Sequence, residues 1–222
     1  MSAPLAIFVR EARLAFAGGG GPAGPAAYFL AALTLAPLAI GPSGATLAVA
    51  GPGVIAFAAL LAVLQGADRL HGEDVSDGTL DIYALSGVTL PLIAFAKTLG
   101  WGLATLWPLP VIGFIGAVSY GLPVPAALMF TAALAASIPG LAFIASFAGA
   151  LAAGVKRAGL LIALIAAPLM IPLLVFAAAA GREAYGGGEA ALANLALTGA
   201  ASLFAAAIFP FAIGAALKAR LE

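Results

Sequence analysis

The sequence contains no cysteine and only one histidine. Without cysteine, the chain cannot form disulfides, cysteine-ligated iron–sulfur clusters or thiolate zinc sites. Charged residues are also scarce, at 8% of the chain, whereas a soluble domain carries about 25%. Hydrophobic residues make up 64%. This composition excludes an ordinary soluble domain and indicates an integral membrane protein.

The sequence also lacks the features of nucleic-acid binding and of nucleotide hydrolysis. Its formal net charge is zero, and no basic stripe is present to bind phosphates. The glycine run Gly18–Gly21 is not followed by the Lys-Ser/Thr pair of a P-loop. We therefore predict that the chain binds no nucleic acid and is not itself catalytic, so that any ATPase activity belongs to a separate subunit.

The acidic residues and the histidine do not form a recognisable metal or haem site. His71 is expected to lie isolated in an aqueous loop, and tetrahedral zinc needs several converging ligands. Asp74, Asp77 and Asp81 do not match a calcium loop, and His71 has no partner for haem ligation. We predict no catalytic residue, no metal and no stably bound cofactor.

What the chain does have is a series of long hydrophobic segments separated by turns. No segment alternates in polarity as a barrel strand does, so we predict an all-α integral membrane protein. At roughly 20 residues per span, 222 residues accommodate six transmembrane helices in a single domain, residues 1–222. The predicted spans are about 25–41, 45–66, 91–120, 125–151, 159–180 and 190–216, with a loop from Arg182 to Glu189.

The distribution of basic residues predicts the orientation of these spans. Residues 2–17 have apolar residues at helical spacing, which indicates a short helix in the membrane interface. One side of the predicted topology carries Arg10, Arg13, Arg69, Lys97, Lys156, Arg157, Lys218 and Arg220; the other carries Arg182 alone. The positive-inside rule then places both termini in the cytoplasm. No charged group is expected deep in a span.

One polar segment, residues 68–81, holds five of the nine acidic residues and the histidine. It lies in a predicted cytoplasmic loop, residues 67–90, between the second and third spans, and is expected to be solvated. Thr79–Leu85 can form a short helix, which Gly78 separates from the preceding residues. An acidic rim around a small apolar centre fits a partner with a basic groove. The predicted docking residues are Asp68, Arg69, Glu73, Asp74, Asp77, Gly78, Thr79, Leu80 and Asp81.

This segment resembles a known class of transporter loop. Gly78-Thr79-Leu80-Asp81, followed by Leu85-Ser86 and by Lys97, is similar to the cytoplasmic loop of ABC-2-type exporter permeases. In that class the loop contains a coupling helix, which sits in a groove of the ATPase subunit. The resemblance therefore implies that the docking residues contact an ATPase.

The whole chain looks like the haem exporter protein B family of cytochrome c maturation. The motifs that carry this resemblance are Arg10-Glu11-Ala12-Arg13-Leu14-Ala15, the glycine run, Leu35-Ala36-Pro37-Leu38-Ala39-Ile40-Gly41-Pro42, Asp68-Arg69-Leu70, Asp74, Asp77-Gly78-Thr79-Leu80-Asp81, Leu90-Pro91, Ala96-Lys97 and Pro168-Leu169-Met170-Ile171-Pro172. Their order and spacing cover nearly all 222 residues. His71 and Gly72 depart from the pattern, where a bulkier apolar or basic residue is expected.

The resemblance implies a permease subunit of a larger assembly in the bacterial inner membrane. Its partners would be an ABC ATPase subunit, a haem-handling membrane subunit with a tryptophan-rich motif, a small single-span subunit and a periplasmic haem chaperone. Either two permease copies or a hetero-complex would form the transporter. Haem enters this picture as the transported substrate, or as cargo of a chaperone that ATP-driven motion releases.

Two other functions remain open on the sequence alone. The chain is also compatible with an ABC-2-type permease for another cargo, such as a lipid or a drug. A membrane scaffold that transports nothing is the third alternative. The three differ in whether an ATPase subunit binds the acidic segment and in whether c-type cytochromes depend on the chain.

Overall fold

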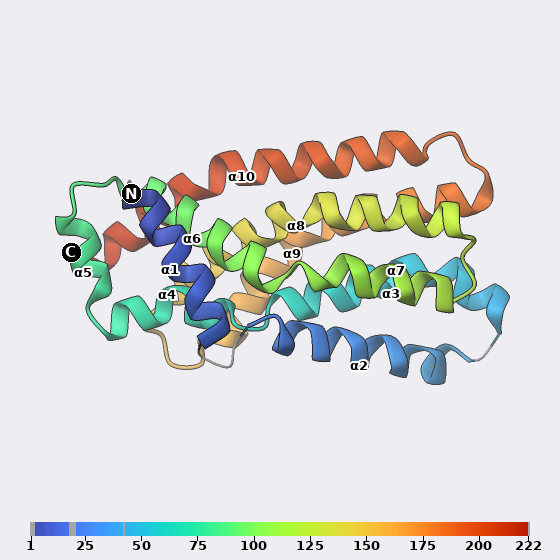
Figure 1. The fold of residues 1–222 in the computed structure, drawn as a ribbon, viewed down its shortest axis with the longest axis horizontal. Coiled ribbons are helices and arrows are strands. Elements are labelled where there is room, and N and C mark those ends of the chain that lie inside the picture. Colours follow the sequence, from blue (N-terminus) through green and yellow to red (C-terminus); the bar gives the residue numbers. More distant parts are fainter. Residues whose placement is uncertain (1–2, 18–20, 42, 222) are drawn as a thin grey trace.

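A computed structural model describes residues 3–17, 21–41 and 43–221, and all the regular structure in these ranges is helical (Figure 1). The helices are α1 (Ala3–Ala17), α2 (Ala23–Ile40), α3 (Gly44–Val63), α4 (Ala67–Ser76), α5 (Thr79–Leu85), α6 (Leu90–Thr105), α7 (Pro108–Ser119), α8 (Val124–Ala152), α9 (Ala158–Gly186) and α10 (Ala191–Leu221). Ser2 of the predicted interfacial helix and residues 18–20 of the glycine run lie outside the described residues. The all-α prediction is confirmed.

Five helical segments in the described ranges are long and apolar enough to cross a membrane. They are α2, the stretch Gly44–Ser76 that joins α3 to α4, α8, α9 and α10. The pair α6 and α7 passes the same test when it is taken as one span, which brings the total to six. The predicted number of spans therefore agrees with the structure if this pair crosses the membrane as a unit.

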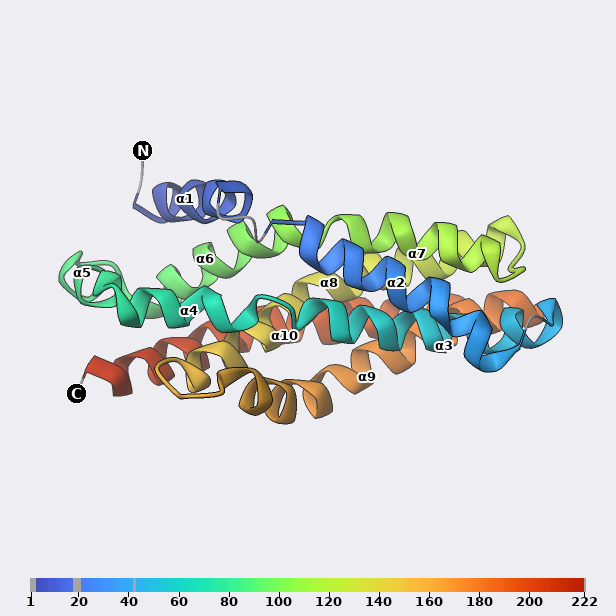
Figure 2. The ribbon, with the colours of Figure 1, turned by 90° about the horizontal axis from the view of Figure 1, so that it is seen from below.

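The third predicted span, residues 91–120, is not one continuous helix. Helix α6 ends at Thr105, α7 begins at Pro108, and the two axes differ by 40°. Pro108 has no amide hydrogen and its ring crowds the preceding turn, which favours a break in the helix at this position. The two halves nevertheless run one after the other along the bundle (Figure 2).

The ends of the bundle differ in the elements that they carry. Helix α1, helices α4 and α5, the connection from α8 to α9 and the end of α10 lie at one end (Figures 1 and 2). The connections α2 to α3, α7 to α8 and α9 to α10 lie at the other. The predicted loop from Arg182 to Glu189 is wrong in its first half, because α9 continues through Arg182 to Gly186.

Helix α8 is the centre of the packing. It contacts α9 and α10 along its length and also touches α3, α4, α6 and α7. Its large inward side chains, such as Phe130 and Phe143, are fully buried. Pro139 interrupts its backbone hydrogen bonding, and the next amide, that of Gly140, donates to Ser202 Oγ of α10 at 2.8 Å. Small residues thus bring the helices close together, as is usual in membrane bundles.

Candidate functional site

The predicted short helix in the polar segment exists with the expected bounds. Helix α5 spans Thr79–Leu85, and Gly78 separates it from α4 with a positive φ of 77°. Asp77 Oδ1 accepts a hydrogen bond of 2.9 Å from the amide of Thr79, which is the local geometry that aspartate favours at turns. Hydrogen bonds from the side chain and the amide of Thr79 lower the pKa of Asp77. The turn therefore fixes where α5 begins.

Two buried side chains attach α5 to the rest of the protein. Leu80 packs in one apolar cluster with Ala94 of α6, Phe143 of α8, and Ile213 and Leu217 of α10. Tyr83 packs in a second cluster with Ile7, Ile93 and Ala96, which belong to α1 and α6. The other side chains that follow Leu80 in α5 are exposed: Asp81, Ile82, Ala84 and Leu85.

The outward face of α5 is largely exposed and partly apolar. Ile82 and Leu85 are 67% and 88% exposed, and Asp81 between Leu80 and Ile82 is also exposed. Large apolar side chains at an exposed helix tip, beside an acidic residue, are typical of a protein contact. Helix α5 therefore has buried side chains on its inner side and exposed side chains on its outer side.

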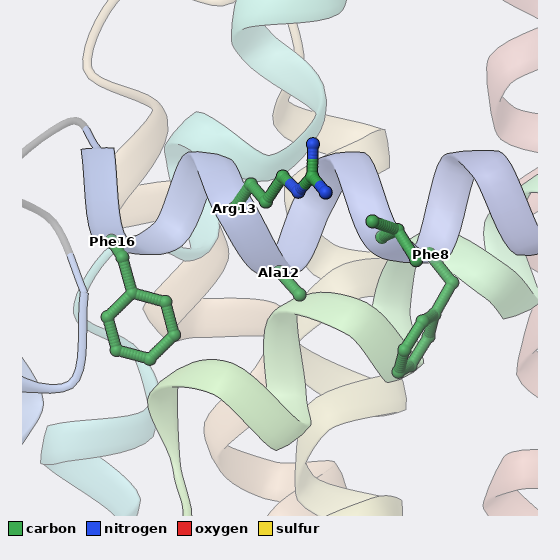
Figure 3. Close-up of a pocket in the computed structure, with 5 residues that line it drawn as sticks. Phe8, Ala12, Arg13 and Phe16 are labelled. Atoms are coloured by element: carbon green, nitrogen blue, oxygen red, sulfur yellow. The ribbon is translucent and has the colours of Figure 1, made fainter.

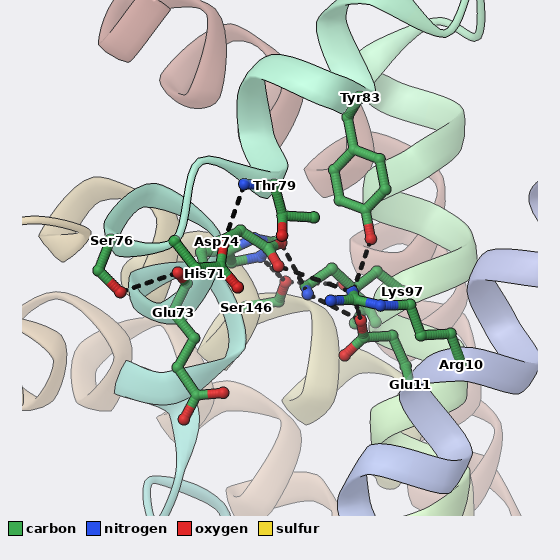
Figure 4. Close-up of polar contacts among 12 residues, drawn as sticks. Arg10, Glu11, His71, Glu73, Asp74, Ser76, Thr79, Tyr83, Lys97 and Ser146 are labelled. Atoms are coloured by element: carbon green, nitrogen blue, oxygen red, sulfur yellow. Dashed lines mark hydrogen bonds and ion pairs between the residues drawn. The ribbon is translucent and has the colours of Figure 1, made fainter.

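A largely buried group of charged side chains, joined by one tyrosine, lies beside α5. This charged cluster consists of Arg10 and Glu11 of α1, Asp74 of α4, Tyr83 of α5 and Lys97 of α6 (Figure 4). Lys97 Nζ lies 2.9 Å from Glu11 Oε1 and 2.7 Å from Asp74 Oδ2. Arg10 Nη1 lies 2.9 Å from Glu11 Oε1 and 3.7 Å from Asp74 Oδ1, and it donates to Tyr83 Oη at 2.8 Å.

The burial of the charged cluster makes its pairing necessary. Glu11, Asp74 and Lys97 are only 6%, 5% and 3% exposed. Removing such charges from water is costly, so each must have an opposite charge and hydrogen bonds nearby. The two carboxylates and two cations balance, which satisfies this condition. Lys97, which the sequence places on the basic side of the predicted topology, therefore has an enclosed and paired ammonium group.

The surroundings of Tyr83 shift its ionisation. Burial, followed by the negative charge of Asp74, raises the pKa of Tyr83 to about 12. The phenol therefore keeps its proton and accepts the hydrogen bond from Arg10 as a neutral group.

A polar cleft of about 380 Å³ opens beside the charged cluster, between α1, α4 and α6. Arg10, Lys97 and the exposed Asp68 are among its lining residues.

Helix α1 lies directly against α6, which is why its charges reach the cluster. A methyl group on Gly100 of α6 would come within 2.6 Å of the carbonyl oxygen of Phe8, so only glycine permits this approach. An open, mostly apolar pocket runs along α1, with Phe8 and Phe16 on either side of Ala12 (Figure 3). Phe16 is 63% exposed. Such a face is typical of a helix in the membrane interface.

A second buried group contains no ionic pair. This neutral cluster consists of His71 of α4, Thr98 of α6 and Ser146 of α8. Ser146 Oγ lies 2.8 Å from His71 Nε2 and 2.7 Å from Thr98 Oγ1. His71 is fully buried, and its Nδ1 has no hydrogen-bond partner among the described residues. The prediction that His71 is isolated in water is wrong.

The structure divides the predicted docking residues into two groups. Asp68, Arg69, Glu73, Asp77 and Asp81 are exposed, Gly78 and Thr79 are partly exposed, and Leu80 and Asp74 are buried. The expectation of a solvated segment therefore fails at Asp74 and Leu80, and also at Leu70 and His71 of the same segment. Asp74 faces the charged cluster, and Leu80 faces the bundle core.

Sequence reasoning did not predict the charged cluster. Arg10, Glu11, Tyr83 and Lys97 all lie outside the predicted docking residues, although one signal pointed to them. A lysine within an apolar segment needs a carboxylate partner. Glu11 and Asp74 lie at the same predicted end of the bundle as Lys97. The separations of 86 and 23 residues hid this pairing, because no local pattern links the partners.

Comparison with known proteins identifies the family. The family model described as CcmB protein matches residues 2–220. "Heme exporter protein B" of Paracoccus denitrificans is 36% identical over 217 residues, which is 98% of this chain and 99% of the relative. The protein of the same name from Escherichia coli K12 is 36% identical over 97% of this chain and 98% of its own length. That of Haemophilus influenzae is 35% identical over 98% of both chains. With a match over nearly its whole length, the chain belongs to the CcmB protein family.

Proposed function

We propose that this chain is the membrane permease subunit of a haem export system for cytochrome c maturation. Its relatives named as haem exporter protein B and its multi-pass apolar helices support this function and a place in the bacterial inner membrane. The permease is not itself an enzyme, and haem is the transported substrate without being stably bound. ATP hydrolysis belongs to a separate ABC ATPase subunit.

Helix α5 is the coupling helix of this permease. The observation that carries this assignment is its geometry: Leu80 and Tyr83 hold the inner side, while Ile82 and Leu85 project from the outer side. Asp81 adds a negative charge at the contact, which complements a basic groove. The bias of basic residues supports a cytoplasmic position for this end, where an ATPase can bind.

Membership of the family supports further partners in the assembly. A haem-handling membrane subunit with a tryptophan-rich motif, a small single-span subunit and a periplasmic haem chaperone complete the pathway. The transporter contains either two copies of this permease or a hetero-complex. Both termini are cytoplasmic in this arrangement, and α1 lies in the inner interface of the membrane.

Replacement of the outer face of α5 tests the coupling assignment. The double variant Ile82→Asp/Leu85→Asp should lose co-purification of the ATPase subunit, because both side chains are exposed and belong to the contact. The amount of permease in the membrane should stay at the wild-type level. Glu189→Lys, at an exposed acid of the opposite end, is the control and should retain the ATPase. Retention of the ATPase by the double variant would refute the assignment.

Removal of the gene tests the biological role. A deletion strain should lose covalently bound haem on its c-type cytochromes, measured by haem staining of denatured proteins, and a plasmid copy should restore it. Normal c-type cytochromes in the deletion strain would exclude this function and favour another cargo.

A further inference from the structure

The way in which α5 is attached leaves two routes for transmitting its movement. Leu80 connects α5 to the centre of the bundle through α8 and α10. Tyr83 connects it to α1 and α6 through its ring and its hydroxyl group. These routes differ in kind, because the first is apolar packing and the second ends in a directed hydrogen bond to a charged group.

The second route continues without interruption into the first half of the broken span. Arg10 donates to Tyr83 Oη and pairs with its neighbour Glu11 at 2.9 Å. Glu11 accepts from Lys97 Nζ, also at 2.9 Å, and Lys97 belongs to α6. Every contact is charge-assisted or involves a charged donor, and such bonds are stronger and more directional than neutral ones.

Helix α1 is suited to move with α5. Helix α1 packs mainly against α6 and is joined to α4 and α5 by the charged cluster, while Leu5, Leu14 and Phe16 on its outer side are exposed. Sliding within the membrane interface costs little, since this side stays in the same surroundings. A rigid link from α5 to α1 therefore displaces α1 more readily than it displaces the central helix α8, which packs against α3, α4, α6, α7, α9 and α10.

We propose that Tyr83 and Arg10 are positioning residues that lock α1 to α5, so that a displacement of α5 is passed through Glu11 and Lys97 to α6. The proposal rests on α5 being the coupling helix. It adds a role for α1, which becomes part of the moving unit.

The hydroxyl group of Tyr83 is the smallest change that tests this lock. Tyr83→Phe keeps the ring in its apolar cluster and removes the bond from Arg10. In cells, the ATPase subunit should still co-purify, while covalent haem attachment to c-type cytochromes falls roughly tenfold, as expected for a lost bond to a charged group. Tyr120→Phe is the matched control, since it removes a hydroxyl that bonds to Leu33 O. Tyr120 directly follows α7, which ends at the opposite end of the bundle from α5 (Figure 1). It should retain wild-type haem attachment.

A second pair of variants separates a lock from general stabilisation. Arg10→Lys keeps the positive charge but loses the planar guanidinium fork. If the two residues act through one contact, Arg10→Lys should also reduce haem attachment, and the double variant with Tyr83→Phe should be no worse than either single variant. Additive losses would show that the residues act independently and would overturn the proposal.

Distance measurements test the common movement directly. Because the chain has no cysteine, spin labels can be placed by Leu5→Cys in α1, Ala84→Cys in α5 and Leu192→Cys at the far end of α10. In the assembled transporter, the Leu5–Ala84 distance should stay constant when nucleotide is added, while the Ala84–Leu192 distance changes. In Tyr83→Phe, the Leu5–Ala84 distance should change as well.

The outcomes distinguish failure of the coupling-helix assignment from failure of the lock alone. Retention of the ATPase by Ile82→Asp/Leu85→Asp would reject α5 as the coupling helix, and the lock with it. Loss of the ATPase in that variant, together with wild-type haem attachment in Tyr83→Phe, would reject the lock alone. A Leu5–Ala84 distance that changes with nucleotide in the wild-type chain would also reject the lock.

Discussion

The charged cluster and the neutral cluster lie side by side, yet they join different parts of the protein. Helix α4 contributes Asp74 to the first and His71 to the second, and α6 contributes the adjacent residues Lys97 and Thr98. The charged cluster reaches outward to α1 and α5, whereas the neutral cluster reaches inward to Ser146 of α8. The comparison suggests a division: ionic contacts connect the peripheral helices, and neutral contacts connect α4 and α6 to the centre.

The largest expected effect is the removal of the central cation. Lys97→Met leaves Glu11 and Asp74 buried without their main partner, and breaking a buried ion pair in this way costs about 3–5 kcal/mol. Unfolding of the purified protein in detergent should show this loss. Lys156→Met, at an exposed lysine, should change the free energy of unfolding by less than about 0.5 kcal/mol. Equal stability of the two variants would mean that the charged cluster is not closed in solution.

An intermediate effect is expected where α4 approaches α8 beside the neutral cluster. A methyl group on Gly149 would clash with the carbonyl oxygen of Ala67, so Gly149→Ala must push the two helices apart at a cost of about 1–3 kcal/mol. Gly72→Ala is the matched control, because a methyl group there meets nothing within 4 Å. It should be neutral, or stabilise α4 by about 0.5–1 kcal/mol. Thermal unfolding of both variants measures the difference, and similar stabilities would argue against the close contact.

The smallest effect is a dependence of stability on pH, which arises from Tyr83 in the charged cluster. Tyr83 ionises at about 12 in the folded chain, against an ordinary value of 10.0. Between these values the unfolded chain has lost the proton and the folded chain has kept it, so the free energy of unfolding falls as pH rises. Tyr83→Phe should remove this part of the decline, measured by denaturant unfolding from pH 9 to about 12. If the free energy of unfolding of Tyr83→Phe falls with pH as steeply as that of the wild type, Tyr83 is not shielded from solvent in the folded chain.

The helices were predictable because their signals are local. Gly78 and the residues that follow it define α5, and apolar length defines most spans. The break between α6 and α7 was missed even though Pro108 is visible in the sequence, because a proline within a span bends some helices and interrupts others. Which outcome occurs depends on the packing around it.

The interior of the site was harder to predict than its surface. Asp81 was placed correctly on an exposed helix, whereas Asp74 only seven residues earlier is buried. Both belong to one acidic segment, and composition cannot tell them apart. The difference arises from Lys97 and Arg10, which approach Asp74 only after distant helices have packed. Burial of His71 was hidden for the same reason, since Ser146 lies 75 residues away in the chain.

The separation of 86 residues between Glu11 and Lys97 also affects how the chain is made. At about 5–20 residues per second, a ribosome needs roughly 4–17 seconds to add that many residues. Through this interval α1 has already been synthesised, and the carboxylate of Glu11 must stay hydrated. Helix α1 can therefore take its final place only after α6 has been made, so its docking depends on a partner that the ribosome adds several seconds later.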